Sequence, residues 1–184
     1  MLASNVTSIE INESYISQES VKVALNSLRY SSQGQVHNPL ENTALVNQMI
    51  TNLALPPSIH IRAYALDCLL TGLIERELIR HRRACDIPLF GNDYSLRELG
   101  EAIARDARTS NPELISWSWL YYHFVRVEFN LLAQDFSRMA FIKERTLRRY
   151  QEHGIWRLTQ HLIAREQRVR ARSASIISMP NSRS

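Results

Sequence analysis

The chain has 184 residues, 45% hydrophobic and 22% charged, which is typical of a globular protein with enough length for a sizeable core. It contains only 5 glycines and 6 prolines, which disfavours an all-β sandwich or barrel because those folds need many tight turns. No apolar run approaches the roughly 18 residues of a membrane span, and residues 1–10 lack the basic and apolar regions of a secretory signal. We therefore expect a soluble protein that makes no membrane contact.

The two cysteines, Cys68 and Cys85, match neither a zinc pattern nor a disulfide framework at their spacing. We expect both to be reduced and mostly buried, as free cysteines usually are. A cytoplasmic location follows as the default for a chain with this cysteine content.

The formal net charge of +4 is distributed unevenly along the chain. Residues 1–137 carry 11 lysines and arginines against 15 acids, a balance of −4. Residues 138–173 carry 10 basic residues against 3 acids, a balance of +7, and Arg183 adds the remaining charge. A basic segment behind a mildly acidic body indicates contact with a polyanion near the C-terminal end, although a solvated basic helix without a partner has the same composition.

Residues 1–18 are rich in serine, asparagine and acids, and are expected to form a disordered N-terminal arm. A helical N-terminal region is expected over residues 19–112, because apolar residues recur there at helical spacing between polar or proline-containing breaks. The expected fold class is all-α, a multi-helix bundle with a C-terminal helix-turn-helix. The helices before residue 112 are expected at about residues 19–30, 40–53, 59–84 and 95–108.

Several of these helices begin with a recognisable cap. Ser17 or Ser20 suits the start of the first, and Ser58, after two prolines, suits the start of the longest. Ser95 and Glu98 have the spacing of a capping box. The longest helix is expected to end in a solvated cluster of cations at residues 80–83, where the helix dipole favours positive charge.

The next helix begins at Asn111-Pro112 and is rich in aromatic residues. Aromatic clusters can stack on nucleic-acid bases, but these side chains follow helical spacing, which favours packing in a core. The aromatic residues are Trp117, Trp119, Tyr121, Tyr122, Phe124 and Phe129.

Residues 113–168 are expected to form a helix-turn-helix region with a long C-terminal helix, followed over residues 169–184 by a basic and then disordered tail. Within this region one helix is expected over about residues 130–139. A second is expected over about residues 143–164, with a kink possible at Gly154.

A 20-residue helix-turn-helix frame that starts at Ala133 has suitable side chains at most of its positions. Apolar residues are needed where the helices face the core, and a small residue is needed where they cross. One departure is Phe141, which lies at the turn position that usually holds glycine, at a cost of about 1 kcal/mol or more. The matching residues are Phe136, Ser137, Ala140, Ile142, Leu147 and Tyr150.

The frame leaves polar side chains at the start of the second helix, the part of this motif that enters the major groove. Arginine can donate two hydrogen bonds to guanine, threonine can reach a base edge, and lysine and arginine neutralise phosphates. The sequence therefore predicts a DNA-binding transcriptional regulator, acting on double-stranded DNA as a homodimer. The predicted DNA-binding residues are Lys143, Arg145, Thr146, Arg148 and Arg149, with secondary basic contacts from Arg138, Arg157, Arg165 and Arg168.

The sequence of residues 143–150 and 154–158 resembles that of a bacterial family, the helix-turn-helix module found ahead of NTPase domains of the STAND or NB-ARC kind and in related stand-alone regulators. The resemblance implies a helical regulatory module that contacts DNA. Phe141 replaces the glycine of that family, and no phosphate-binding GxxxxGK[ST] motif is present, so ATP binding is not expected. The residues in line with the family pattern are Trp119, Tyr122, Phe136, Ser137, Ile142, Glu144, Arg145, Thr146, Arg149 and Leu158.

Two other binding functions stay open. In the first, the helix-turn-helix is a scaffold and the chain is a protein-interaction adaptor that docks an acidic partner protein. An exposed Phe141 would favour this alternative, because an aromatic side chain suits a protein contact better than a phosphate contact. In the second, the basic residues 165–172 bind RNA or nucleic acid without sequence preference.

Enzymatic activity is not expected, because no catalytic motif is present. His81 and Cys85 could supply two metal ligands on one helix face, but structural zinc usually needs four, so neither a metal nor a cofactor is expected. Glu75 and Glu77 fall on different helix faces and are expected to be solvated. The histidines at 153 and 161 are expected to be exposed and without a role.

Overall fold

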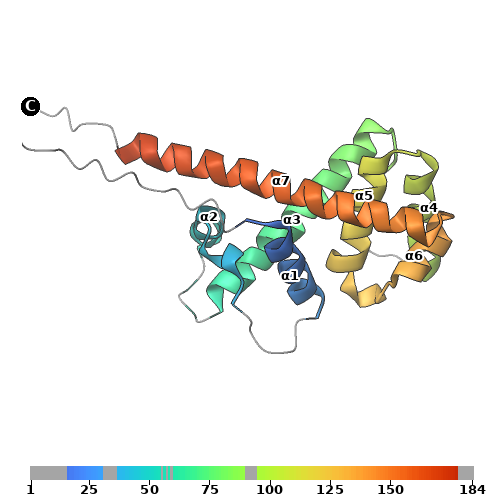
Figure 1. Cartoon of the computed structure of the whole chain (residues 1–184), viewed down its shortest axis with the longest axis horizontal. Coiled ribbons are helices and arrows are strands. Elements are labelled where there is room, and N and C mark those ends of the chain that lie inside the picture. The colour runs from blue at the N-terminus through green and yellow to red at the C-terminus, as the bar shows by residue number, and fades with distance from the viewer. Residues whose placement is uncertain are drawn as a thin grey trace, which may run out of the picture.

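The structure is a computed structural model that describes residues 16–30, 37–54, 56, 58, 60–89 and 95–177. All regular elements in these ranges are helical, which confirms an all-α bundle (Figure 1). The elements in chain order are α1 (Gln18–Arg29), the 3-10 turn η2 (Pro39–Asn42), α2 (Ala44–Asn52), α3 (Ile61–Ala84), α4 (Leu96–Arg108), α5 (Pro112–Leu120), the π-helical turn η3 (Tyr121–Val125), the 3-10 turn η4 (Val127–Phe129), α6 (Ala133–Ala140) and α7 (Glu144–Ile177).

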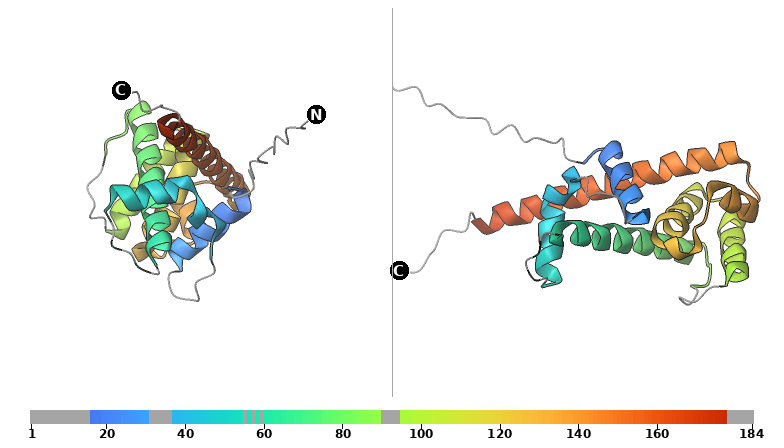
Figure 2. Two further views of the ribbon diagram at one scale, coloured as in Figure 1. Left: turned by 90° about the vertical axis from the view of Figure 1, so that its left-hand side faces the viewer. Right: turned by 90° about the horizontal axis from the view of Figure 1, so that it is seen from below.

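Two long helices, α3 and α7, organise the bundle. Helices α1 and α2 pack near one end of this pair, and α4, α5 and α6 form the other end (Figures 1 and 2). Helix α7 begins beside α6, crosses α5, and continues past α2 until its last turns extend beyond the other helices. None of the helices in the described ranges has the length and apolar character needed to cross a membrane.

Most of the expected caps are present. Ser17 caps α1, and the Ser95 hydroxyl accepts a hydrogen bond from the Glu98 amide at 3.3 Å, as the capping box requires. The expectation for Ser58 is wrong: α3 begins at Ile61 with His60 in the cap position, and the Ser58 carbonyl accepts a bond from the Ile61 amide at 3.2 Å.

The expected helix over residues 40–53 is divided into η2 and α2. Thr43 separates them, because its hydroxyl bonds the Leu40 carbonyl at 2.8 Å and accepts a bond from the Val46 amide at 3.4 Å. The buried carboxylate of Glu166 on α7 then accepts bonds from the first two amides of α2, both at 3.0 Å. A side chain more than 120 residues away therefore fixes where α2 begins.

The aromatic residues of α5 and η3 form the centre of the core, as their spacing predicted. Trp117, Trp119, Tyr122 and Phe124 are buried, whereas Tyr121 and Phe129 are half-buried at the margin. The backbone changes to π-helical geometry at Tyr121, which the sequence pattern did not indicate. The rest of the core comes from apolar residues of all seven α-helices in the described ranges.

The basic end of α3 is not entirely solvated, contrary to expectation. Arg82 is 4% exposed and bonds both carboxylate oxygens of Asp106 on α4, at 2.9 and 2.7 Å, and the Tyr122 hydroxyl at 2.9 Å. The Ser118 hydroxyl donates to the same carboxylate at 2.7 Å. Burial disfavours the charge, but the bonds to Asp106 outweigh it and raise the pKa of Arg82. This network joins α3, α4, α5 and η3.

Helix α7 runs without interruption through Gly154, where the sequence left a kink possible. Glycine serves here to let two helices approach closely, since a Cβ atom at this position would lie 3.2 Å from the Ser116 carbonyl oxygen and 3.3 Å from Leu120. The expected tail is also corrected in part, because α7 includes residues 169–177. Residues 178–184 and most of the expected N-terminal arm lie outside the described residues.

Candidate nucleic-acid interface

The predicted site lies where α6 meets α7, at one end of the bundle (Figure 1). The two helices are joined by the three residues 141–143. Phe136, Ala140 and Leu147 are buried beneath this turn, and Ser137, at the position where a small residue was expected, is buried too. Its hydroxyl donates to the Ile142 carbonyl at 2.5 Å and so closes the turn.

Phe141 adopts the left-handed backbone conformation, with φ of 55° and ψ of 36°. This is the conformation that glycine usually supplies. The ring is 84% exposed and contributes little to the core. A strained backbone around an exposed aromatic ring is a combination that packing alone does not explain.

The predicted DNA-binding residues share one surface at the start of α7. We call the four cations among them, Lys143, Arg145, Arg148 and Arg149, the recognition segment. All four are exposed, and none has an ion-pair partner among the described residues. Thr146 is half-buried and lies between them in the chain. Since Glu144 is also exposed, this end of α7 carries a balance of +3.

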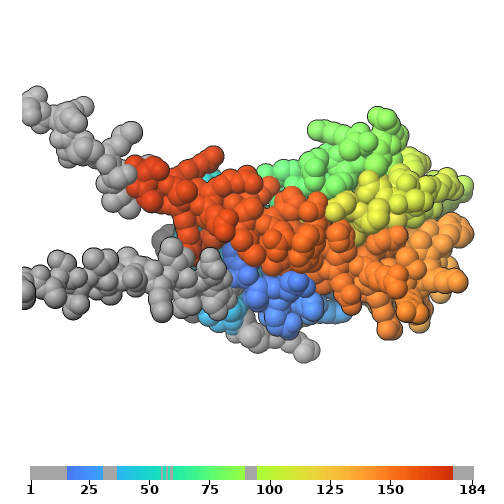
Figure 3. All heavy atoms as spheres, turned by 45° about the horizontal axis from the view of Figure 1, so that its top comes forward, coloured from blue at the N-terminus to red at the C-terminus, as the bar shows by residue number. Residues whose placement is uncertain are grey.

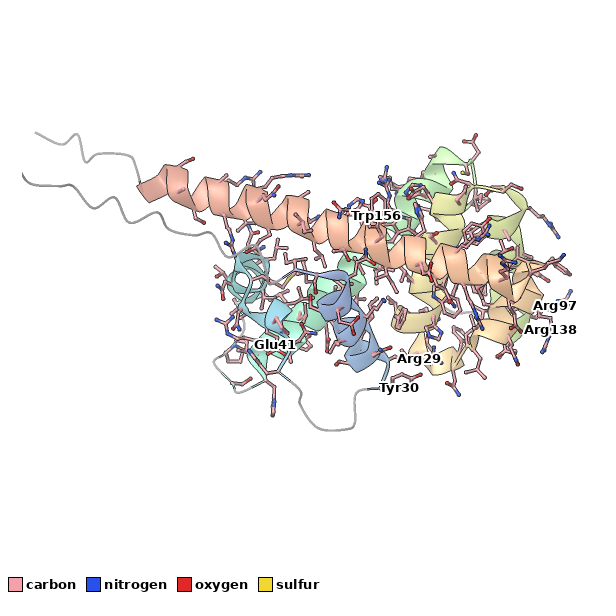
Figure 4. All side chains as sticks on the ribbon, viewed as in Figure 1. Arg29, Tyr30, Glu41, Arg97, Arg138 and Trp156 are labelled. Carbon is pink, nitrogen blue, oxygen red and sulfur yellow. The ribbon has the colours of Figure 1, made fainter. Side chains whose placement is uncertain are left out.

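The secondary basic residues do not share one surface. Arg138 on α6 is exposed next to the recognition segment, with its nearest carboxylate, Asp135, 3.8 Å away (Figure 4). Arg157 is part-exposed, and its guanidinium bonds Glu113 of α5 at 2.9 Å within the fold. Arg165 and Arg168 lie near the other end of α7 and belong to a different face of the molecule.

A shallow open hollow of about 420 Å³ lies beside the turn. Its walls combine the exposed phenylalanine with polar and charged side chains from both helices, so it offers apolar contact and positive charge side by side. The residues that line it are Gln134, Ser137, Arg138, Phe141, Ile142, Lys143 and Glu144.

The histidines of α7 were expected to be exposed and without a role, and that expectation is wrong. His153 lies 2.9 Å from Glu113, and His161 lies 3.6 Å from Glu77 on α3. Burial is the largest influence on the pKa of His161, and it lowers that pKa. Glu77 is itself buried rather than solvated, with its other oxygen 2.7 Å from Arg80. No spacing within the chain could have indicated these pairs, because each joins two separate helices.

The acid Glu113 contacts two side chains of α7 at once, His153 and Arg157. Burial favours its neutral form, but hydrogen bonds from these two side chains outweigh that effect and lower the pKa of Glu113. Among the described residues, no group of three or more histidine, cysteine or acidic side chains could hold a metal ion. Both cysteines are free and half-buried, less enclosed than expected.

Comparisons of the chain with protein-family models, with curated proteins and with solved structures each found no match. The resemblance to the helix-turn-helix module therefore stays a prediction that rests on the residues quoted for it.

Proposed function

We propose that the chain is a DNA-binding regulator in which α6 and α7 act as a helix-turn-helix and the start of α7 enters the major groove. The observation that carries this proposal is the recognition segment, four exposed cations without an ion-pair partner in the described part of the chain. Cations that the fold does not neutralise are available to phosphates and to the acceptor atoms of guanine.

The spacing of the arginines supports groove contact. Arg148 and Arg149 follow Arg145 by three and four residues, so the three side chains project from one face of α7. Leu147 is buried on the opposite side and fixes the orientation of that face. An arginine held on a packed helix presents its planar donors in a defined direction, as bidentate recognition of guanine requires.

We propose further that the active species is a homodimer. A single recognition helix reads few base pairs, and two copies on adjacent half-sites multiply the specificity. Half-sites about 10 base pairs apart, centre to centre, are expected from the pitch of DNA.

The test begins with the full chain and a pool of random duplexes, from which bound sequences are selected and their affinity is measured by fluorescence anisotropy at several salt concentrations. We expect a discrete sequence to be enriched. Replacing both Arg145 and Arg148 with alanine should weaken binding to that sequence by about 10- to 100-fold and reduce the dependence on salt. Helix content should not change.

The matched control replaces Arg83 and Arg108, two exposed arginines elsewhere, and so removes the same charge. The control should bind within about twofold of the original chain if contact depends on the recognition segment rather than on net charge. Equal losses in the two variants would refute groove contact at residues 143–149.

The second candidate is an adaptor for an acidic protein, and the exposed Phe141 favours it. An aromatic side chain beside Arg138 and Lys143, at the rim of the hollow, has the composition of a protein-binding hot spot. The two candidates differ in one substitution: Phe141→Ala should abolish capture of an acidic partner, and should leave affinity for DNA nearly unchanged.

A further inference from the structure

A second group of cations lies on the side of α7 that faces α3, away from the recognition segment. We call it the α3–α7 basic face. Figure 3 shows α7 in orange and the C-terminal half of α3 in green, side by side on one surface of the molecule. The cations of this face are Arg76 and Arg80 on α3 and Arg157, Arg165 and Arg168 on α7, and His161, whose pKa is lowered by burial, lies among them.

Contacts around Glu77 establish that the two rows of cations are neighbours. Its two carboxylate oxygens lie 2.7 Å from Arg80 and 3.6 Å from His161, so this acid bridges the helices. Arg76 is adjacent to Glu77 in α3, and Arg165 is one helical turn beyond His161 in α7. The α3–α7 basic face is therefore a cluster made by the fold and not by the sequence alone.

The carboxylates within this cluster are already engaged. Glu77 serves Arg80 and His161, and Glu113 serves Arg157. The remaining arginines have no carboxylate partner among the described residues, and they are half-buried or exposed. They are Arg76, Arg165 and Arg168.

Arg165 shows what this arrangement costs. Its side chain is half-buried, and burial is the largest cause of its lowered pKa. The charges of Arg76 and Arg168 lower the pKa further, whereas Glu77 raises it. A fold that holds several like charges around one carboxylate that is already paired gains when an anion binds between them. Arginine is also the cation whose planar donors match the oxygens of a phosphate in pairs.

We propose that the α3–α7 basic face binds the phosphodiester backbone of a nucleic acid, as a second contact separate from the recognition segment. Nucleic acid is favoured over an acidic protein because the side chains left without a carboxylate are all arginines, whose planar donors match phosphate oxygens in pairs. The exposed Trp156 ring lies about 180° from Arg165 around α7 and is not part of this face. The placement of the first contact rests on the proposed function.

The two contacts cannot lie on one straight duplex. Arg165 follows Arg145 by 20 residues, which is about 30 Å along a helix, and the rotation of about 100° per residue leaves the two facing roughly opposite sides of α7. A single chain should therefore hold two separate nucleic-acid segments, and should bridge two duplexes.

Bridging can be measured by capturing the full chain on an immobilised 30-base-pair duplex and counting a second, fluorescent duplex of the same sequence that it retains. The test variant carries Arg76→Ala, Arg165→Ala and Arg168→Ala. We expect it to retain about one fifth or less of the second duplex, while its affinity for one duplex in solution falls by no more than about threefold. The control replaces the exposed Arg83, Arg97 and Arg108 with alanine and should bridge normally.

Each other result has a definite meaning. The proposal fails if the original chain binds DNA but does not bridge, or if the test variant bridges as well as the control, since a dimer would then supply both contacts. Binding of poly-glutamate, a model of an acidic protein, is measured for the same variants. If the test variant loses poly-glutamate binding but still bridges two duplexes, the face serves an acidic protein and the proposal is equally refuted. Should the test variant prove unstable by thermal melting, the exposed pair Arg76→Ala and Arg168→Ala replaces it and should lose at least half of the bridging.

The failure of one contact can be told from the failure of the other. If Arg145→Ala with Arg148→Ala leaves binding to a single duplex intact, and adding the three substitutions of the test variant then removes it, the recognition segment is wrong and the α3–α7 basic face stands. The reverse pattern refutes the face and keeps the proposed function.

Discussion

Arginines at two places in this bundle differ sharply in their surroundings. Arg82 is enclosed between α3, α4 and η3, with a bidentate bond to Asp106 and a further bond to Tyr122. Arg145 and Arg148 stand on the surface at the start of α7, without an ion-pair partner in the described part of the chain. The first arginine holds the helices together, and the others leave their charge available.

The difference teaches that a cluster of cations in the sequence says little about what each cation does. Arg82 lies within a run of basic residues at a helix end, as exposed arginines often do, yet its partner is 24 residues away. Position on the helix decides the outcome: Arg82 follows the buried Leu78 by four residues and shares its inward face.

The largest expected effect comes from removing the buried Arg82 and, separately, one exposed arginine at the start of α7. Arg82→Ala leaves Asp106 buried without its cation, so the free energy of unfolding should fall by about 3–5 kcal/mol. Arg148→Ala, the matched surface change, should alter it by less than about 0.5 kcal/mol. Urea denaturation followed by circular dichroism measures both. A loss below about 1 kcal/mol for Arg82→Ala would show that the network adds little to stability.

Much of the fold could be predicted from the sequence, because helical spacing, serine caps and the Asn111-Pro112 start are local signals. The boundaries that failed depend on distant residues. Helix α2 begins where the Glu166 carboxylate accepts hydrogen bonds from its first two amides. Helix α7 passes Gly154 without a kink, and α5 lies close at that point. Such constraints appear only once the helices are packed together.

His123 lies in a half-buried site that disfavours its charged form. His123 stacks on Trp119 with 4.1 Å between ring centroids, its Nδ1 donates to the Leu131 carbonyl at 2.9 Å, and the Arg29 guanidinium lies against its ring. Burial is the largest influence on the pKa of His123 and, with Arg29, lowers it to about 4, against the opposing bond to Leu131.

Because the folded pKa lies below the ordinary value of about 6.5, the unfolded chain binds more protons in this range, and stability is lost as the pH falls. We expect a loss of about 1–2 kcal/mol from this residue between pH 6.5 and 4.5, after allowance for partial exposure. His123→Gln keeps a donor but cannot titrate. Denaturation at several pH values should therefore give the variant a shallower slope than the original chain, and identical slopes would contradict the assignment.

A smaller change sharpens the comparison by converting a paired arginine into an unpaired one. Glu113→Gln removes the acid that neutralises Arg157 and contacts His153, both part-exposed, so stability should fall by only about 1 kcal/mol. The freed guanidinium adds a charge to the α3–α7 basic face, and affinity for DNA should rise about two- to threefold at low salt. Glu101→Gln, which frees the exposed Arg97, is the control for stability. Unchanged affinity would argue that Arg157 is not near bound DNA.

The residue types of the candidate site could be predicted from the sequence, but which of its cations form ion pairs with acids could not. The spacing at the start of α7 placed three arginines on one surface, since Leu147 and Tyr150 had to face inward. The engagement of Arg157 by Glu113 and the bridge through Glu77 join helices that are far apart in the chain. Which cations are free is therefore a property of the packed bundle.

The smallest expected effect concerns Phe141, the residue that separates the two candidate functions. Its left-handed backbone costs about 1 kcal/mol or more, whereas its ring is 84% exposed and gains little from packing. In Phe141→Gly the strain is relieved but the unfolded chain becomes more flexible, so the free energy of unfolding should rise by between 0 and about 1 kcal/mol. Denaturation midpoints measure this change.

A fall of more than about 1 kcal/mol in Phe141→Gly would mean that the ring packs after all, and the observed exposure would then not indicate a contact surface. With stability kept, binding decides what the ring is for. Affinity for DNA should be unchanged, because the recognition segment contains no part of residue 141. A protein with an acidic surface should lose its main anchor if the chain is an adaptor. A turn that tolerates strain without gaining either kind of binding would leave the exposed ring without a physical reason, so this substitution tests both candidates through one side chain.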